Sequence, residues 1–392
     1  MSWETIKLGD IANFSNGVNF DKSAYSKGVK LIGVSNFGNR FYPDYDSLEE
    51  IKKEIVRTND YLLDDDIVFV RSNGNKELVG RCMLIKNLKA PVTYSGFCIR
   101  ARLQNVSKYY PVFFAYYFKS ANFRKTLTGT AIGANIQNLS QSRLSSCIVK
   151  VPTYNTQKYI ANILSAYDDL IENNQKQIKL LEEMAQRLYK EWFVDLRFSN
   201  YENTPIVDGV PQGWNRERLV DIADVQYGFA FDGSQFNSEG NGMPIIRIRN
   251  IPSGITKDYT TEKAHDQYIV KNGDIVVGMD GEFHINSWCG SDSYLVQRTC
   301  CIKPKNTEMN GYLLQAIHKP IKFFESTVVG ATVAHLGKKH IDTITILTAP
   351  DKLYKPFQQY FNKRQLLLNQ NQMLAEARDR LLPKLMSGEI DI

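Results

Sequence analysis

The chain has 392 residues, which is more than one ordinary hydrophobic core supports, so we expect two or more domains. Hydrophobic residues make up 43% and charged residues 23%, a composition that is typical of a folded protein and excludes a disordered or collagen-like chain. The net charge of +6 permits a polyanionic partner but does not require one.

The first residues lack a basic head followed by an apolar run, so we expect no signal peptide and a cytoplasmic protein. The longest apolar stretch, residues 109–118, is about half the length of a membrane span, and no membrane partner is expected. The cysteines show no CxxC spacing, which predicts neither a zinc site nor a disulfide framework. These cysteines are Cys82, Cys98, Cys147, Cys289, Cys300 and Cys301.

Residues 1–152 are predicted to form the first globular domain. Short segments at 66–71 and 98–103 are rich in β-branched residues and bounded by Gly, Asn or Asp, which favours strands. A shorter helix is expected near 109–125. This mixture indicates an α+β domain of roughly 150 residues, an ordinary domain size.

Residues 153–198 are predicted to form a long central helix. From residue 160 onward the pattern keeps strict 4-3 spacing, the a/d seam of a coiled coil, with one polar member. The seam residues are Ile160, Leu164, Tyr167, Ile171, Asn174, Ile178, Leu181, Ala185, Leu188 and Trp192.

Residues 199–350 are predicted to form a second α+β domain, after a break at 205–213 that is rich in Pro and Gly. The segment 245–250 is expected to be a strand that places Arg247 and Arg249 on one face. A helix is expected near 310–326. The adjacent Cys300 and Cys301 lie in a strand-like stretch and are interpreted as buried structural cysteines.

Residues 351–392 are predicted to form a second long helix. Its broader apolar stripe includes Tyr360, Leu367, Leu374 and Leu381, which recur every seven residues. Two amphipathic helices from equivalent halves are expected to pack on each other as an antiparallel coiled coil that separates the globular domains. The alternative is that each helix packs only on its own domain, but heptads of this length favour a helical partner.

The two halves resemble each other, which indicates a gene duplication with a pseudo-twofold internal repeat. Segment 66–68 matches 274–276, segment 136–139 matches 333–336, and segment 174–177 matches 369–372, in the same order. A shift of 211 residues superimposes seven identical pairs without a gap. These pairs are Trp3 and Trp214, Leu8 and Leu219, Asp10 and Asp221, Ile11 and Ile222, Ala12 and Ala223, Gly17 and Gly228, and Phe20 and Phe231.

No catalytic or metal-binding motif is recognisable. The sequence lacks the motifs of an adenine methyltransferase, and residues 330–339 have the wrong spacing for a phosphate-binding P-loop. Carboxylate runs at 64–66 and 168–169 are typical of loops and helix starts. His335 and His340 lie five residues apart and do not share a helical face. The sequence therefore indicates a binding protein without catalytic residues.

The doubled order of globular half and heptad helix resembles the specificity subunit of type I restriction-modification enzymes, which are host-defence systems. The similar segments are 7–12 with its echo at 218–223, 66–72, and the helix ends at 188–195 and 380–389. The resemblance covers essentially the whole chain.

This resemblance implies that each globular half is a target-recognition domain that reads one half of a split, asymmetric target in double-stranded DNA. The helices would set the gap and dock two modification subunits, which carry the S-adenosylmethionine site. A further motor-nuclease subunit would use ATP and Mg²⁺. This chain would be non-catalytic and bind none of these cofactors.

Base readout requires polar side chains on a strand or loop that enters the major groove. Candidates in the first half lie mainly on the loop after residues 66–70, and the second half offers the equivalent loop and the segment 245–250. They are Arg71, Ser72, Asn73, Asn75 and Lys76, with Asn36 and Arg40 as secondary choices, and Asp280, Glu282, His284, Arg247, Arg249 and Asn250. Loops at 129–135 and 330–335 are candidates for contact with the DNA backbone, and a solvated loop or phosphate contact is the alternative role throughout.

Three rival interpretations stay open. The chain could be the specificity chain of a related multisubunit methyltransferase or restriction system, which neighbouring genes would distinguish. It could be a stand-alone endonuclease or methyltransferase, against which the missing motifs argue. It could also be a coiled-coil connector that binds proteins and not DNA, although two large diverged domains are excessive for that role.

Overall fold

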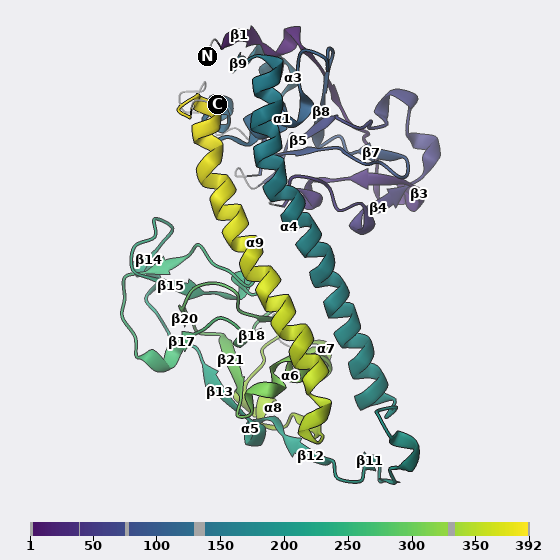
Figure 1. The fold of residues 1–392 in the computed structure, drawn as a ribbon, viewed down its shortest axis with the longest axis vertical. Helices are drawn as coiled ribbons and strands as arrows, with labels where there is room; N and C mark the ends of the chain where they lie inside the picture. Colours follow the sequence, from purple (N-terminus) through teal and green to yellow (C-terminus); the bar gives the residue numbers. More distant parts are fainter. Residues whose placement is uncertain (1–2, 39, 75–77, 129–137, 328–333, 391–392) are drawn as a thin grey trace. The chain divides into compact units, whose positions relative to one another are not determined.

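Figure 1 shows the computed structural model, which describes residues 3–38, 40–74, 78–128, 138–327 and 334–390. The chain divides into two compact units. Unit 1 combines Met1–Leu170 with Leu374–Ile392, and unit 2 consists of Ile171–Met373. Both units contain helices and sheets, so the predicted α+β class is confirmed.

Unit 1 contains a four-stranded antiparallel sheet in the order β2-β8-β5-β6 and a three-stranded sheet in the order β4-β3-β7, in which β3 and β7 run parallel. The first and last strands, β1 and β9, pair with each other. The strand bounds are β1 Glu4–Lys7, β2 Ala12–Asn16, β3 Tyr25–Ile32, β4 Glu49–Ile51, β5 Ile67–Val70, β6 Cys82–Leu84, β7 Val92–Tyr94, β8 Cys98–Leu103 and β9 Ile148–Val151.

The strand β5 shows why a short apolar run becomes a central strand here. Successive side chains of a strand point to opposite faces of its sheet. Ile67 and Phe69 enter the main core of unit 1, whereas Val68 and Val70 enter a second core on the other face. Because both faces are covered, the run is continuously apolar and does not alternate with polar residues.

One helical region of the globular part of unit 1 was predicted, and a further short helix, α3, was not. The helix predicted near 109–125 is present as two segments that are interrupted at Ser120, and Pro111 occupies the first turn, where its missing N–H costs nothing. Ser140 caps a third helix by accepting a hydrogen bond from the Arg143 amide. The bounds are α1 Pro111–Lys119, α2 Ala121–Thr128 and α3 Gln141–Ser146.

Unit 2 repeats the four-stranded sheet of unit 1, but its second sheet has five strands, in the order β14-β16-β15-β20-β17, instead of three. Its four-stranded sheet has the order β13-β21-β18-β19, its strands β15 and β20 are parallel neighbours, and β12 pairs with β22. Ile275 and Val277 enter one core while Val276 enters another, as in β5. The strand bounds are β10 Ile206–Val207, β11 Val210–Pro211, β12 Asn215–Arg218, β13 Ala223–Tyr227, β14 Phe236–Asn237, β15 Met243–Ile246, β16 Tyr259–Thr260, β17 Ile269–Val270, β18 Ile275–Gly278, β19 Ile285–Ser287, β20 Ser293–Leu295, β21 Thr299–Pro304 and β22 Thr345–Thr348.

Two predictions for unit 2 are confirmed. The helix expected near 310–326 is present as two segments, and Cys300 and Cys301 are buried in β21, as predicted. Burial raises the pKa of Cys300 to about 12, so the thiol stays neutral at physiological pH. The helix bounds are α5 Leu219–Ile222, α6 Asn310–Ala316, α7 His318–Thr327 and α8 Lys338–Asp342.

The prediction of a strand over residues 245–250 is wrong in its second half. β15 ends at Ile246, and Ile248–Asn250 forms a 3-10 helix. The cause is Asn250, whose side-chain oxygen accepts a hydrogen bond from the Arg247 amide at 2.8 Å and folds the backbone back. Arg247 and Arg249 therefore do not share one face of a strand.

The two long helices are α4, Tyr154–Tyr189, and α9, Lys355–Ser387. In unit 2 they run antiparallel, because Asn174 of α4 donates to Asn371 at 3.0 Å whereas Glu182, further along α4, accepts from Arg364 at 2.6 Å. In unit 1 the start of α4 and the end of α9 share one core, which contains Ile160 together with Leu385.

The predicted seam residues are all buried or half-buried. The helices do not pack on each other alone, because the core that holds Ile160 and Leu164 also contains side chains of the globular part of unit 1. Buried members are Ile160, Leu164, Asn174, Ile178, Ala185 and Leu367, and half-buried members are Tyr167, Ile171, Leu181, Leu188, Trp192, Tyr360, Leu374 and Leu381.

Candidate nucleic-acid interface

In unit 1, three stretches of chain meet at one end of the sheet. The Arg71 amide donates to the Phe97 carbonyl at 2.7 Å, and the Leu139 amide donates to the Arg71 carbonyl at 2.8 Å. Ser72 forms an isolated antiparallel bridge with Asn138, and its hydroxyl hydrogen-bonds the Asn138 side chain. We call this group, Arg71, Ser72, Phe97 and Asn138, the first junction.

Unit 2 builds the same junction from different side chains. The Met279 amide donates to the Arg298 carbonyl at 2.9 Å, and the Leu336 amide donates to the Met279 carbonyl at 2.7 Å. Asp280 and His335 form the isolated bridge that corresponds to Ser72 and Asn138. The second junction therefore consists of Met279, Asp280, Arg298 and His335.

The second junction carries a charged cluster. The Asp280 carboxylate contacts the His335 Nδ1 at 2.5 Å and accepts a hydrogen bond from the Arg298 guanidinium. Burial raises the pKa of this carboxyl group, but the hydrogen bonds from His335 and Arg298 outweigh that effect and the net pKa is lowered. Asp280 is therefore ionised at neutral pH and fixed by two partners.

Phe97 and Arg298 are both exposed members of the junctions, with exposed fractions of 64% for the residue and 66% for the side chain, respectively. Each directly precedes the equivalent strand, β8 or β21, and each supplies the carbonyl that holds the neighbouring strand end. Sequence reasoning missed both positions. A shift of 201 residues superimposes β8 on β21 and would have paired them.

The predicted loop residues lie at or near these junctions. Arg71 and Ser72 belong to the first junction, and the Arg71 guanidinium also donates to the Gly96 carbonyl at 3.3 Å. Asn73 follows directly, whereas Asn75 and Lys76 lie outside the described residues, as do residues 129–135 and 330–333 of the two predicted backbone-contacting loops.

In the second half, Asp280 belongs to the junction, and Glu282 and His284 follow on the connection between β18 and β19. Glu282 is exposed, and its carboxylate lies 3.6 Å from the His284 Nδ1.

The remaining predicted residues have internal partners. Asn36 accepts a hydrogen bond from the Gly33 amide at 2.8 Å, which is the same capping role that Asn250 plays for Arg247 in unit 2. The structure therefore uses both asparagine side chains to shape a turn.

The exposed arginines among these candidates are tied by ion pairs. Arg40 pairs with Asp44 at 3.2 Å, and Arg249 pairs with Asp258 at 2.5 Å. The exposed pair of Arg40 rearranges at low energetic cost, so its guanidinium stays available to an external partner. Arg249 instead donates from two nitrogens to the half-buried Asp258.

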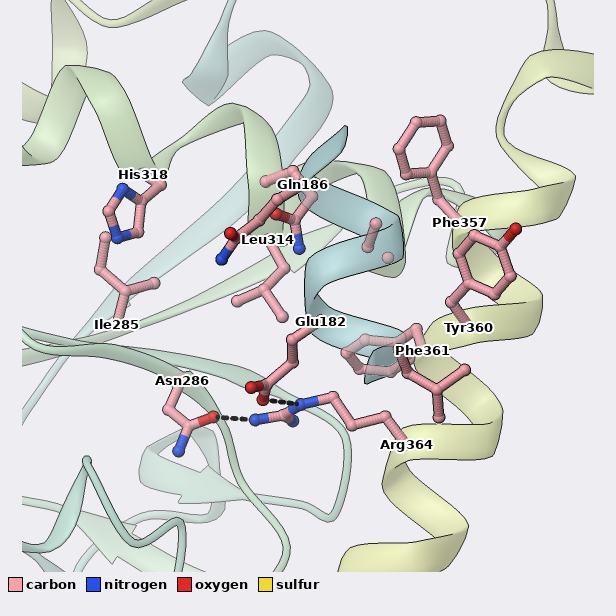
Figure 2. Close-up of a pocket in the computed structure, with 14 residues that line it drawn as sticks. Glu182, Gln186, Ile285, Asn286, Leu314, His318, Phe357, Tyr360, Phe361 and Arg364 are labelled. Carbon is pink, nitrogen blue, oxygen red and sulfur yellow. Dashed lines mark hydrogen bonds and ion pairs between the residues drawn. The ribbon is translucent and has the colours of Figure 1, made fainter. Parts of the chain in front are cut away.

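Within unit 2, the helices and the globular part enclose a pocket of about 180 Å³. Figure 2 shows the guanidinium of Arg364 of α9 beside Glu182 of α4 and Asn286 of β19, whereas His318 and Gln186 lie across the pocket from it. The Arg364 guanidinium donates to Glu182 at 2.6 Å and to Asn286 at 2.8 Å. This arrangement ties the helices to the sheet and is structural.

Among the described residues, no three His, Cys, Asp or Glu side chains are grouped so that they could hold a metal ion. Within the same residues, no helix has the length and apolar character of a membrane span.

Comparisons with known proteins agree with this geometry. The family model described as "Type I restriction modification DNA specificity domain" matches residues 1–183 and 211–359. The chain is 28% identical to the type I restriction enzyme MjaIX specificity subunit of Methanocaldococcus jannaschii, over 71% of this chain and 68% of that relative. It is 21% identical to the HindI specificity subunit of Haemophilus influenzae, over 99% of both chains.

The fold is similar to the crystal structure of a type I restriction-modification S subunit from M. genitalium. The TM-score is 0.55 at 17% sequence identity, and the match covers 98% of this chain and 96% of that one.

Proposed function

The chain belongs to the family of type I restriction-modification DNA specificity domains, whose role is to recognise DNA sequence, and we propose that it reads a split, asymmetric target. In this proposal unit 1 reads one part of the target and unit 2 the other. The observation that supports it best is the pair of junctions, which share the same backbone hydrogen bonds and isolated bridge but present Phe97 in one unit and Arg298 in the other. Side chains that differ in this way recognise different base edges, so the two half-sites differ.

The modification chemistry belongs to partner subunits in this proposal. Several apolar side chains of the long helices are exposed, which is typical of a protein-binding surface. They are Leu170, Leu180 and Met184 of α4, and Leu366 and Met373 of α9. We assign these exposed side chains, Leu170 in unit 1 and the other four in unit 2, to contacts with two modification subunits, which use S-adenosylmethionine to methylate adenine. A motor-nuclease subunit that uses ATP and Mg²⁺ joins through the assembled complex. The chain itself binds none of these cofactors and catalyses no step.

The helices also set the distance between the two half-sites in this proposal. Supporting it, α4 and α9 each contribute residues to both units as uninterrupted helices. A helix has a fixed rise of about 1.5 Å per residue and therefore serves as a spacer of defined length.

The test is to co-express the chain with its modification partner in a host that lacks adenine methylation and to map methylated adenines across the genome. We expect one motif with two unlike specified parts and an unspecified gap of constant length. A palindromic motif, an uninterrupted motif, or methylation without sequence preference would contradict the proposal. The modification partner expressed alone is the control and should leave the motif unmethylated.

A further inference from the structure

We propose that Arg298 reads guanine in the half-site of unit 2, with its guanidinium held in place by Asp280, and that Phe97 occupies the equivalent reading position in unit 1. The inference rests on the proposed function, because it names the residues that distinguish the two half-sites. Neither residue was identified from the sequence.

The backbone position of Arg298 is unusual. Its φ angle is 66°, in the left-handed region that is disfavoured for residues other than glycine, asparagine and aspartate. Its carbonyl accepts the Met279 amide, which fixes the turn directly before β21. Backbone strain at an exposed polar residue is often associated with a functional site.

The side chain of Arg298 is oriented without being buried. Its side chain is 66% exposed, whereas the Asp280 side chain that it contacts is only 12% exposed and also contacts His335. A guanidinium carries five N–H donors in a rigid plane. The contact with Asp280 involves one nitrogen and leaves the others to bind a ligand, at a reduced entropic cost because the plane is already oriented.

The surrounding charge favours a base over a phosphate. Arg298 is paired with Asp280, and the exposed carboxylate of Glu282 lies on the adjacent connection, so this guanidinium is not an unpaired cation of the kind that binds phosphate by charge alone. Arginine paired with the O6 and N7 atoms of guanine is the commonest specific contact in the major groove. A paired, pre-oriented arginine therefore fits the base edge.

Unit 1 presents a different chemistry at the same place. Phe97 is 64% exposed, and its carbonyl accepts the amides of Arg71 at 2.7 Å and Ser72 at 3.3 Å. An exposed phenylalanine on a fixed turn fits the methyl group of thymine, which is the apolar feature of the major groove. The acid of unit 2, Asp280, is replaced here by Ser72, so the Arg–Asp pair is confined to the second junction.

The experiment uses the full chain in complex with its modification partner, and its readout is the genome-wide map of methylated adenines. For Arg298→Ala we expect one guanine of the unit 2 half-site to become unspecified, with about a 5- to 150-fold loss of preference at that position. The unit 1 half-site and the gap should stay unchanged. For Asp280→Asn, which keeps the shape but removes the charge, we expect a smaller loss at the same position.

The matched control is Arg218→Ala. Arg218 is also in unit 2, its side chain is 60% exposed, and it is paired with Asp221 at 2.8 Å, but it is not one of the four residues of the second junction. This variant should leave the motif unchanged. If Arg298→Ala leaves every base of the motif specified, or weakens methylation uniformly at all sites, Arg298 is not a base reader and the inference fails.

A second variant covers the case in which Arg298→Ala does not fold. The pair Phe97→Arg with Ser72→Asp transfers the arginine and its acid into the first junction. We expect one thymine of the unit 1 half-site to be replaced by guanine in the methylated motif, and retention of that thymine would overturn the inference. If the unaltered chain yields no split motif at all, the proposed function itself fails, which is a distinct outcome.

Discussion

Asp66 lies directly before β5, and its carboxylate is almost fully buried. It accepts hydrogen bonds from Nε and Nη2 of Arg102, both at 2.7 Å, and from the Leu63 amide at 2.8 Å. Unit 2 repeats this clamp with Asp274, which pairs with Lys303 at 2.9 Å and accepts the Lys271 amide at 2.8 Å. Arg102 donates to Asp66 from two nitrogens, whereas Lys303 has a single nitrogen for Asp274. The contact in unit 1 therefore has more hydrogen bonds.

We therefore predict that Asp66→Asn destabilises unit 1 by about 1.5–3 kcal/mol and that Asp274→Asn destabilises unit 2 by less. Both variants keep the side-chain volume and lose the charge. Hydrogen–deuterium exchange would report the opening free energy of each unit separately. An equal or larger effect of Asp274→Asn would show that the two-nitrogen contact of Arg102 adds no stability over the single-nitrogen contact of Lys303.

At the scale of elements, α9 is attached to its surroundings by arginines that face α4. In unit 2, Arg364 bonds Glu182, Asn286 and Ser287. In unit 1, Arg378 pairs with Asp168, which also accepts a hydrogen bond from Tyr116 at 2.5 Å. Each arginine of α9 contacts an acidic residue of α4. In unit 2 Arg364 itself also contacts the globular part, and in unit 1 Asp168 does so through Tyr116. The seam between the helices therefore combines apolar packing with specific polar contacts.

Replacing Arg364 with alanine should destabilise unit 2 by roughly 1.5–3 kcal/mol, because its partners lose their donor while Glu182 remains partly hydrated. Lys363→Ala, an exposed neighbour on the same helix, should change stability by less than about 0.5 kcal/mol. Denaturant unfolding of the two variants and the unaltered chain measures the difference. Equal stabilities would mean that apolar packing alone holds α9.

The sequence predicted these elements because their signals are local. Heptad spacing identified α4, and short runs rich in β-branched residues, bounded by Gly, Asn or Asp, identified β5 and β8. The segment after β15 was predicted wrongly because one side chain, Asn250, bonds the backbone and overrides a β-branched pattern.

The sequence predicted only some residues of the candidate interface. Arg71 and Asp280 follow apolar strands and were visible in the sequence. Phe97 and Arg298 were not, because their role depends on the meeting of three stretches that lie far apart in the chain. They could have been identified from the sequence only by extending the alignment of the two halves to β8 and β21, which pairs Phe97 with Arg298.

At the scale of the whole molecule, the proposed spacer role of α4 and α9 makes a quantitative prediction. The boundary between the units falls after Leu170 in one helix and after Met373 in the other. One heptad inserted at each point adds about 10 Å of helix and leaves the contacts within each unit intact. DNA rises about 3.4 Å per base pair, so the gap in the methylated motif should lengthen by about three base pairs. A motif with the original gap would rule out the spacer role, and substitutions at the same points without insertion are the control.

Unit 1 is assembled from residues at both ends of the sequence, and this has a consequence for synthesis on the ribosome. Its core requires Leu385 and Met386 of α9 beside Ile160 and Leu164 of α4. More than 200 intervening residues must therefore be translated before this core can close. Unit 2 is continuous in sequence and can complete its fold first, so the part of the chain that is made earliest is the last to mature.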